Sequence, residues 1–195
     1  MARFEVLKDH ALIERFKNAF CSRISYDIPS TYFKKGECYA LLEDEKTITS
    51  EGTMNRIRIV GGFCLIHDLP WKLRSIKQIP EDAFLQATRD LPTLKTAEFT
   101  GYFLNDKKYG LLFTSHLVKT CLLHKASRFV YSYPTRQTGL EKYYSKGKPR
   151  RLYSGLPAKL PGHKDKMEDE NVEVLTRWGI IKIFMARTIR EILKK

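Results

Sequence analysis

Two lysines and a glycine lie where a strand is expected to give way to a helix, a combination suited to binding an anion. The segment KKYGLL, residues 107–112, follows a strand-like stretch that ends at Leu104. Backbone N–H groups at a helix start are unpaired, and the helix dipole adds positive potential there. With Lys107 and Lys108 beside them, such amides fit a phosphate group. Taken alone, the same residues also fit a solvated turn, which is the more common outcome for one glycine-containing bend.

The overall charge also favours an anionic partner. The 195 residues include 35 Lys and Arg against 22 Asp and Glu, a formal net charge of +13. Such a surplus favours nucleic acid, an acidic protein, a phosphorylated cofactor or an anionic membrane surface. Hydrophobic residues make up 43% and charged residues 29% of the chain, as in an ordinary globular protein. Its length predicts a single domain over residues 1–195.

Several classes of protein and site are disfavoured by what the sequence lacks. The longest apolar run, Ile59 to Ile66, is far shorter than the ~20 residues of a membrane-spanning helix. The charged start has no apolar signal segment, and the four cysteines include no CxxC pair. His67, His116 and His124 lack metal-ligand spacing, so structural roles are favoured for them. We therefore expect a cytoplasmic protein with reduced thiols, no membrane-spanning segment and no metal.

Hydrophobic periodicity predicts an α/β fold, with a mixed sheet flanked by helices on both faces. The expected helices are 12–24, 81–88, 111–125, 135–146 and 179–193, and the expected strands are 37–42, 56–66, 95–104, 128–133, 150–154 and 172–177. For 180–185 a strand competes with the helix. Residues 43–45 are expected to form a turn, and residues 50–55 and 157–169 to form loops. The first two strands should pair antiparallel, and the two β–α–β passes should make part of the sheet parallel.

Strict alternation along 95–104 would divide its side chains between the two faces of the sheet. One face would carry Ala97, Phe99, Gly101 and Phe103, and the other Glu98, Thr100, Tyr102 and Leu104.

This order of segments resembles the GNAT superfamily of N-acyltransferases. The resemblance covers residues 11–155 and is carried by ECYALLEDE at 37–45, IVGGF at 59–63, TAEFTGYFL at 96–104, KKYGLL at 107–112, RFVYSYP at 128–134 and LEKYYSKGKPRRLYSG at 140–155. Lys107 stands where the family has Gln or Arg, and Leu112 where it has a small residue. The chain is also similar to relatives that use acyl-carrier protein, the acyl-homoserine lactone and long-chain N-acyl amino acid synthases. The loop, last strand and final helix of 156–195 lie beyond the resemblance.

The resemblance implies a mostly antiparallel sheet and direct attack of an amine on an acyl thioester in a ternary complex. The donor would be acetyl-CoA, a longer acyl-CoA or acyl-carrier protein, and the acceptor a small-molecule amine. Glu98 would be the base that receives a proton from the amine; an ion pair with a basic side chain is the equally weighted alternative. Tyr144, with Tyr143 as alternate, would protonate the departing thiolate. The donor would be held by residues of the central strand and the following loop, namely Phe103, Leu104, Lys107, Lys108, Tyr109, Gly110, Leu111 and Leu112.

The basic run after residue 141 leaves other functions open. It consists of Lys142, Lys146, Lys148, Arg150 and Arg151, with Lys159, Lys164 and Lys166 downstream. It fits a dock for a nucleotide phosphate or an acidic carrier protein. It also fits nucleic acid, with Tyr143, Tyr144 and Tyr153 as stacking faces, or a solvated surface. A non-catalytic acyl-binding module is a further alternative. The final helix, with Ile181, Met185, Ile189 and Ile192 on one side, is expected to cap the sheet, with peripheral membrane contact as the alternative.

Overall fold

A single twisted sheet forms the centre of the molecule. The computed structural model describes residues 2–24, 27–49, 52–160 and 168–192. Its strands are β1 (Ala2–Val6), β2 (Gly36–Thr49), β3 (Gly52–Ile66), β4 (Thr96–Leu104), β5 (Arg128–Pro134), β6 (Arg150–Gly155) and β7 (Glu170–Thr176). The order across the sheet is β1-β2-β3-β4-β5-β7-β6. In the described chain, every neighbouring pair is antiparallel except β4 and β5, which confirms the predicted mixed, mostly antiparallel sheet.

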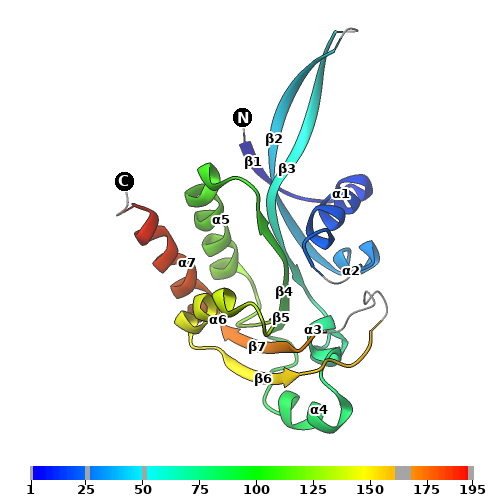
Figure 1. Ribbon diagram of the computed structural model, residues 1–195, viewed down its shortest axis with the longest axis vertical. Coiled ribbons are helices and arrows are strands. Elements are labelled where there is room, and N and C mark those ends of the chain that lie inside the picture. The colour runs from blue at the N-terminus through cyan, green and yellow to red at the C-terminus, as the bar shows by residue number, and fades with distance from the viewer. Residues whose placement is uncertain (1, 25–26, 50–51, 161–167, 193–195) are drawn as a thin grey trace.

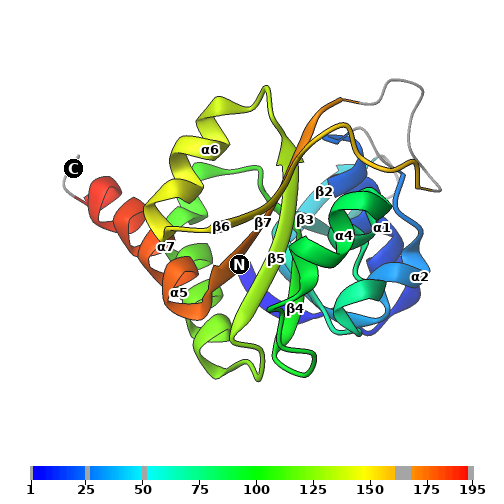
Figure 2. The same cartoon turned by 90° about the horizontal axis from the view of Figure 1, so that it is seen from below.

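Helices cover both faces of this sheet, as predicted. On one face lie α1 (His10–Cys21), α2 (Ser30–Phe33), α3 (Arg74–Lys77) and α4 (Glu81–Thr88), and on the other α5 (Gly110–Leu123), α6 (Thr138–Tyr144) and α7 (Arg177–Ile192). Figure 2 shows the two groups on opposite sides. Each group packs its own hydrophobic core: Phe16 and Phe33 centre the first, and Phe63, Phe113 and Phe129 the second. Of the helices described, none has the length and apolar character needed to cross a membrane.

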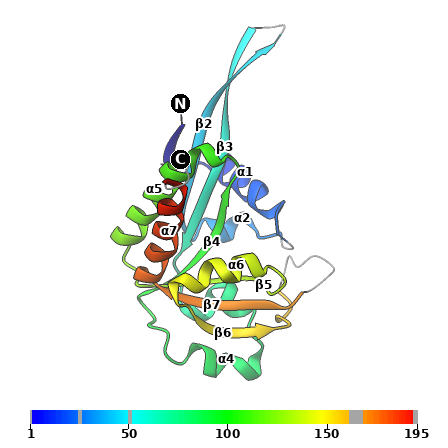
Figure 3. The same ribbon diagram turned by 60° about the vertical axis from the view of Figure 1, so that its left-hand side comes forward.

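The hairpin of β2 and β3 is longer than predicted and projects beyond the rest of the sheet (Figures 1 and 3). The expected turn at 43–45 is wrong, because these residues pair with 56–58 and the ladder continues to Thr49 and Gly52. Oppositely charged side chains stabilise the pairing of β2 with β3: Glu43 lies 2.7 Å from Arg58 across the two strands. The expected loop at 50–55 is likewise mostly strand, with residues 50 and 51 outside the described residues. Strand β1, which the sequence analysis did not predict, pairs with β2.

The C-terminal region completes the sheet in an order that the sequence did not indicate. β7 lies between β5 and β6 in the sheet. The second β–α–β unit, β5–α6–β6, therefore joins two parallel strands that are not neighbours. The helical prediction for 180–185 is confirmed, and α7 packs on the sheet and α5. Its buried face agrees with the expected one only in part: Ile181 is buried as expected, together with Ile180, Ile183 and Phe184, whereas Met185 and Ile189 are about half exposed.

A bulge in β4 breaks the predicted alternation. Thr100 pairs with Cys64 and Phe103 pairs with Gly62, so two residues, 101 and 102, oppose one residue of β3. Gly101 has φ +67°, the left-handed conformation that glycine adopts without steric cost. Tyr102 consequently packs in the α5 core with Phe99, while Phe103 packs in the α1 core. The prediction that Glu98 and Tyr102 share a face is therefore wrong.

The bulge should depend on glycine at position 101. A Cβ there would lie 2.9 Å from two atoms of the buried Phe16 ring, in a conformation unfavourable for L-residues. We expect Gly101→Ala to lower the free energy of unfolding by about 1–3 kcal/mol, measured by urea denaturation. Gly139→Ala is the matched control: it lies in α6 with nothing within 4 Å, so helix propensity should stabilise it by about 1 kcal/mol. Equal stability of Gly101→Ala and the native protein would contradict the proposed constraint.

Candidate active site

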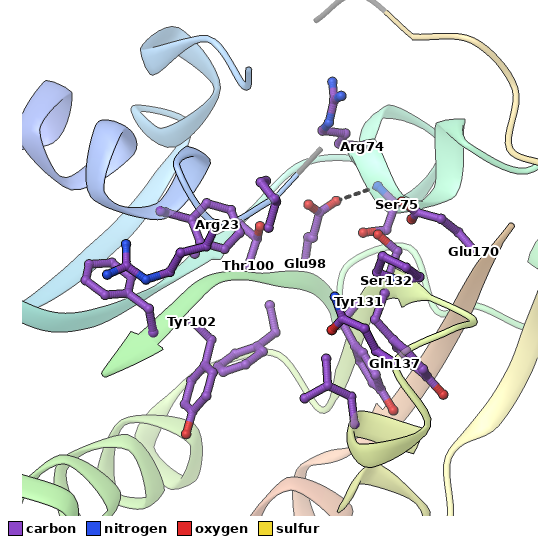
Figure 4. Close-up of a pocket in the computed structure, with 18 of the residues that line it drawn as sticks. Arg23, Arg74, Ser75, Glu98, Thr100, Tyr102, Tyr131, Ser132, Gln137 and Glu170 are labelled. Atoms are coloured by element: carbon purple, nitrogen blue, oxygen red, sulfur yellow. Dashed lines mark hydrogen bonds between the residues drawn. The ribbon is translucent and has the colours of Figure 1, made fainter. Parts of the chain in front are cut away.

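A cavity lies where β4 and β5 separate. The two strands pair only at Thr96–Arg128, Ala97–Phe129 and Glu98–Val130. From the last of these pairs onward, residues 98–104 and 131–134 line a cavity of about 410 Å³. Its walls also include Phe20 of α1 and Ile24 just after that helix on one face, and Leu140 and Tyr144 of α6 on the other. The cavity therefore joins the two faces of the sheet through the gap (Figure 4).

Glu98, the predicted base, lies in this cavity. Its side chain is 2% exposed, and Oε2 accepts hydrogen bonds from the Tyr32 hydroxyl and the Ser75 backbone N–H, both at 2.9 Å. Burial raises the pKa of Glu98, while these donors and the charge of Arg74 act in the opposite direction. A carboxylate held in place by two donors is suited to binding a cation or accepting a proton.

Glu170 is a second carboxylate in the same cavity, and the sequence analysis missed it. It opens β7, where it is 2% exposed, and burial raises its pKa to about 7. Figure 4 shows it extending from β7 toward the side of the cavity occupied by Ser75 and Ser132. No local motif marks it, because the segment ENVEVLT resembles any strand with an acidic first residue. Only the position of β7 beside β5 brings it to the site.

The two candidate tyrosines occupy different environments. Tyr144 lines the cavity on the α6 side, with its ring centre 4.5 Å from that of Tyr131. Burial raises the pKa of Tyr144, so its hydroxyl keeps its proton at neutral pH. Tyr143 is not among the cavity-lining residues; it packs edge-on against Phe184 of α7, with ring centres 6.0 Å apart. Of the two predicted tyrosines, Tyr144 is therefore the one that lines the cavity.

A network of charged groups on β5, β6 and β7 fixes the wall next to Tyr144. Tyr131 donates a hydrogen bond of 2.7 Å to Glu173, which is 3% exposed. Arg151 lies 2.8 Å from Glu173 and 2.7 Å from Glu141. The Tyr131 hydroxyl is committed to Glu173, so the network orients its ring against Tyr144. It also pairs Arg151, a residue of the predicted basic run, with two carboxylates.

The predicted donor-binding residues divide into two groups. Phe103 and Leu104 line the cavity, whereas residues 107–112, all described by the structure, do not. In the loop, Lys108 N–H donates to the Asp106 carboxylate, Tyr109 N–H to the Asp106 carbonyl and Gly110 N–H to the Lys107 carbonyl. These three amides are thus engaged by the loop itself.

A carboxylate from the long hairpin also reaches this loop. Glu43 of β2 lies 3.1 Å from the Lys108 ammonium and accepts a hydrogen bond from the Tyr109 hydroxyl. These donors lower the pKa of Glu43 to about 2, so it is ionised at neutral pH. The positive potential expected from Lys108 is therefore partly neutralised.

The remaining candidates do not form a second site of the expected kind. His67 and His124 stack with ring centres 4.3 Å apart and their Nε2 atoms hydrogen-bonded, and burial lowers the pKa of His124 to about 4. Among the described residues, no three His, Cys, Asp or Glu side chains are grouped to hold a metal. In the basic run, Arg150 lies 3.7 Å from Asp90, and Lys164 and Lys166 fall outside the described residues. The burial of Tyr144 leaves it no exposed stacking face.

Comparison with known proteins identifies the fold. Neither a protein-family model nor a curated protein sequence matches this chain. Among solved structures, NAA60 of Arabidopsis thaliana bound to a bisubstrate analogue is similar, with TM-score 0.58 and 11% identity over 90% of this chain and 99% of that one. FeeM, an N-acyl amino acid synthase from uncultured soil microbes, has TM-score 0.58 and 15% identity over 91% and 92%. A probable acetyltransferase from Staphylococcus epidermidis has TM-score 0.52 and 12% identity over 90% and 99%.

These neighbours confirm the fold implied by the resemblance. The chain has the architecture of GNAT acyltransferases, and an N-acyl amino acid synthase is among the structures that share it.

The buried carboxyl of Glu170 should make the stability of the protein depend on pH. Its pKa is raised to about 7, so the folded state holds a proton that the unfolded state releases at lower pH. Its contribution is complete below the unfolded value near 4.5 and is lost as the pH rises through 7. We expect Glu170→Gln to remove that loss, on the order of 3 kcal/mol between the two limits, in urea titrations at a series of pH values. A variant with the native pH dependence would show that Glu170 does not titrate in this range.

Proposed function

We propose that this protein, which has the GNAT fold, is an N-acyltransferase that moves an acyl group from acyl-CoA or acyl-carrier protein to an amine. The observation that carries the proposal is the cavity through the sheet, which contains Glu98 toward one face and Tyr144 toward the other. A donor and an acceptor entering from opposite faces would meet in the gap between β4 and β5. The neighbours in the comparison include a probable acetyltransferase and an N-acyl amino acid synthase, which support acyl transfer as the reaction class.

The thioester would lie along the free edge of β4. On the side that faces β5, the backbone groups of residues 99–104 are outside the ladder that the two strands form. Backbone N–H groups directed into the gap can polarise the thioester carbonyl and stabilise the oxyanion that forms on attack. Phe103 and Leu104 would contact the donor at the end of this strand.

Proton transfer would divide between the two faces. The amine nitrogen attacks the carbonyl carbon, and Glu98 accepts the proton that the nitrogen loses as the tetrahedral intermediate collapses. When the C–S bond breaks, the Tyr144 hydroxyl gives its proton to the thiolate. The Tyr144 hydroxyl is available for this role because its pKa lies above neutrality, so the group is protonated at the start of each cycle.

Binding of the donor should raise the melting temperature of the protein, because a ligand that binds only the folded state stabilises it.

Turnover should depend on the two cavity residues Glu98 and Tyr144. Glu98→Gln and Tyr144→Phe should each lower kcat by 10²-fold or more, roughly the contribution of one acid–base group. Tyr143→Phe should retain activity, since its ring packs outside the cavity. The assay is thiol release from acetyl-CoA with a panel of amines. Unchanged turnover in Glu98→Gln would remove the assignment of the base.

The predicted phosphate contact at residues 107–112 can be tested through Glu43, since the phosphates of CoA nearest the pantetheine arm form a diphosphate. If Lys107, Lys108 and the start of α5 bind a diphosphate, the ionised Glu43 beside Lys108 opposes that binding. We expect Glu43→Gln to lower the KM for acetyl-CoA by about 2–5-fold, the effect of one partly screened charge.

Acetyl-pantetheine is the matched control, because it carries the same thioester without the diphosphate, and its KM should not change. Equal effects on both donors would contradict a diphosphate contact and favour a donor held by its pantetheine arm, such as acyl-carrier protein.

A further inference from the structure

The conversion of an ammonium into an amide requires the removal of two protons. A primary amine at neutral pH carries three hydrogens on nitrogen, and the amide product carries one. One proton must leave before attack, because an ammonium has no lone pair, and the second leaves after the N–C bond forms. The mechanism above assigns the second proton to Glu98 and leaves the first without an acceptor.

The register of the sheet places a second carboxylate on the same face as Glu98. Glu98 pairs with Val130 of β5, and Val130 pairs with Val174 of β7. Counting back along β7 by an even number of residues from Val174 reaches Glu170, so both glutamates point to the face covered by α1 to α4. Val130 and Val174 pack in the core of that face, which agrees with this placement. Tyr144 packs in the opposite core.

The surroundings of Glu170 suit a group that exchanges protons. The charged side chains that line the same cavity are Arg23 of the segment after α1, Arg74 of α3, Glu98 of β4 and Arg136 after β5. Arg136 is paired with Glu168 at 2.5 Å, and Arg23 donates to Asn105 at 2.6 Å. Burial holds the pKa of Glu170 close to neutral, so it can take a proton from a bound ammonium and release it to solvent.

We propose that Glu170 is a second catalytic carboxylate, which removes the first proton from the acceptor ammonium bound between it and Glu98. This inference rests on the proposed acyl transfer. The proton passes from nitrogen to the Glu170 carboxylate, and the freed lone pair attacks the thioester carbonyl carbon. The N–C bond forms, the C–S bond breaks, and the thiolate takes the Tyr144 proton. Glu98 takes the second proton. Both carboxylates then release their protons to solvent, and the Tyr144 phenolate takes one proton back from solvent on its own face of the sheet.

The net reaction is then ammonium plus thioester giving amide, thiol and one proton. The two carboxylates therefore have separate catalytic roles. Glu170 is needed only when the acceptor binds as an ammonium, whereas Glu98 is needed for every acceptor amine. This difference makes the proposal testable with two amines that differ in basicity but not in composition.

The test compares 2-phenylethylamine with its isomer 4-ethylaniline, using acetyl-CoA as donor at pH 7. The first is an ammonium at this pH and the second is a neutral amine. We expect Glu170→Gln to lower kcat/KM for 2-phenylethylamine by about 10²-fold and to leave 4-ethylaniline within about threefold. Raising the pH should restore the rate of the variant with 2-phenylethylamine, because the neutral fraction of that amine grows. Glu98→Gln should lose both activities.

Two controls separate the possible failures. Glu81→Gln makes the same charge change at an exposed residue of α4, outside the cavity lining, and should leave both amines unaffected. Glu170→Asp keeps the carboxylate and should retain part of the activity with 2-phenylethylamine. If the native protein acylates neither these two amines nor any other amine of the panel, with acyl-CoA or acyl-carrier protein as donor, the proposed function fails and this inference fails with it. If the native protein is active but Glu170→Gln affects both amines equally or neither, the role of Glu170 is wrong and the proposed function stands.

Discussion

The separation of two parallel strands is the constraint on which the rest of the structure depends. A sheet satisfies its backbone N–H and C=O groups by continuous pairing, and β4 and β5 give up that pairing after Glu98 and Val130. The bulge at Gly101 and the ring of Phe16 hold β4 in this course. The exposed edge provides hydrogen-bonding groups inside a cavity, and their need for partners makes the gap a place to bind another extended chain or a thioester arm.

The gap also connects two separate hydrophobic cores. Each face of the sheet has its own set of buried aromatic residues, so the groups brought to the gap come from independent parts of the molecule. Glu98 is held from the face of α2 and α3 through Tyr32 and Ser75. Tyr144 is held from the face of α6 and α7, beside Tyr131. An arrangement of this kind allows two reactants to approach from opposite sides without competing for one entrance.

The distribution of charge differs between the surface and the cavity. The chain carries a net charge of +13, yet two of the side chains buried at its centre are glutamates. A carboxylate loses its favourable hydration free energy when it is buried. At Glu98 the hydrogen-bond donors offset part of this loss. Retaining two carboxylates in one cavity is consistent with a cationic substrate group, while the basic exterior suits an anionic donor.

The sequence alone determined much of this protein. The periodicities located the long helices and the central strands, the order of segments indicated the GNAT fold, and the strand pattern placed Glu98 at its centre. Tertiary structure decided what local patterns cannot encode. Period-two counting failed at Gly101, because a bulge depends on the partner strand. The acidic residues 43–45 form a strand that pairs with residues 56–58, where Arg58 binds Glu43. Glu170 became a cavity residue because β7 inserts beside β5. Such pairings join residues distant in the chain, so their energy appears only when both strands are in place.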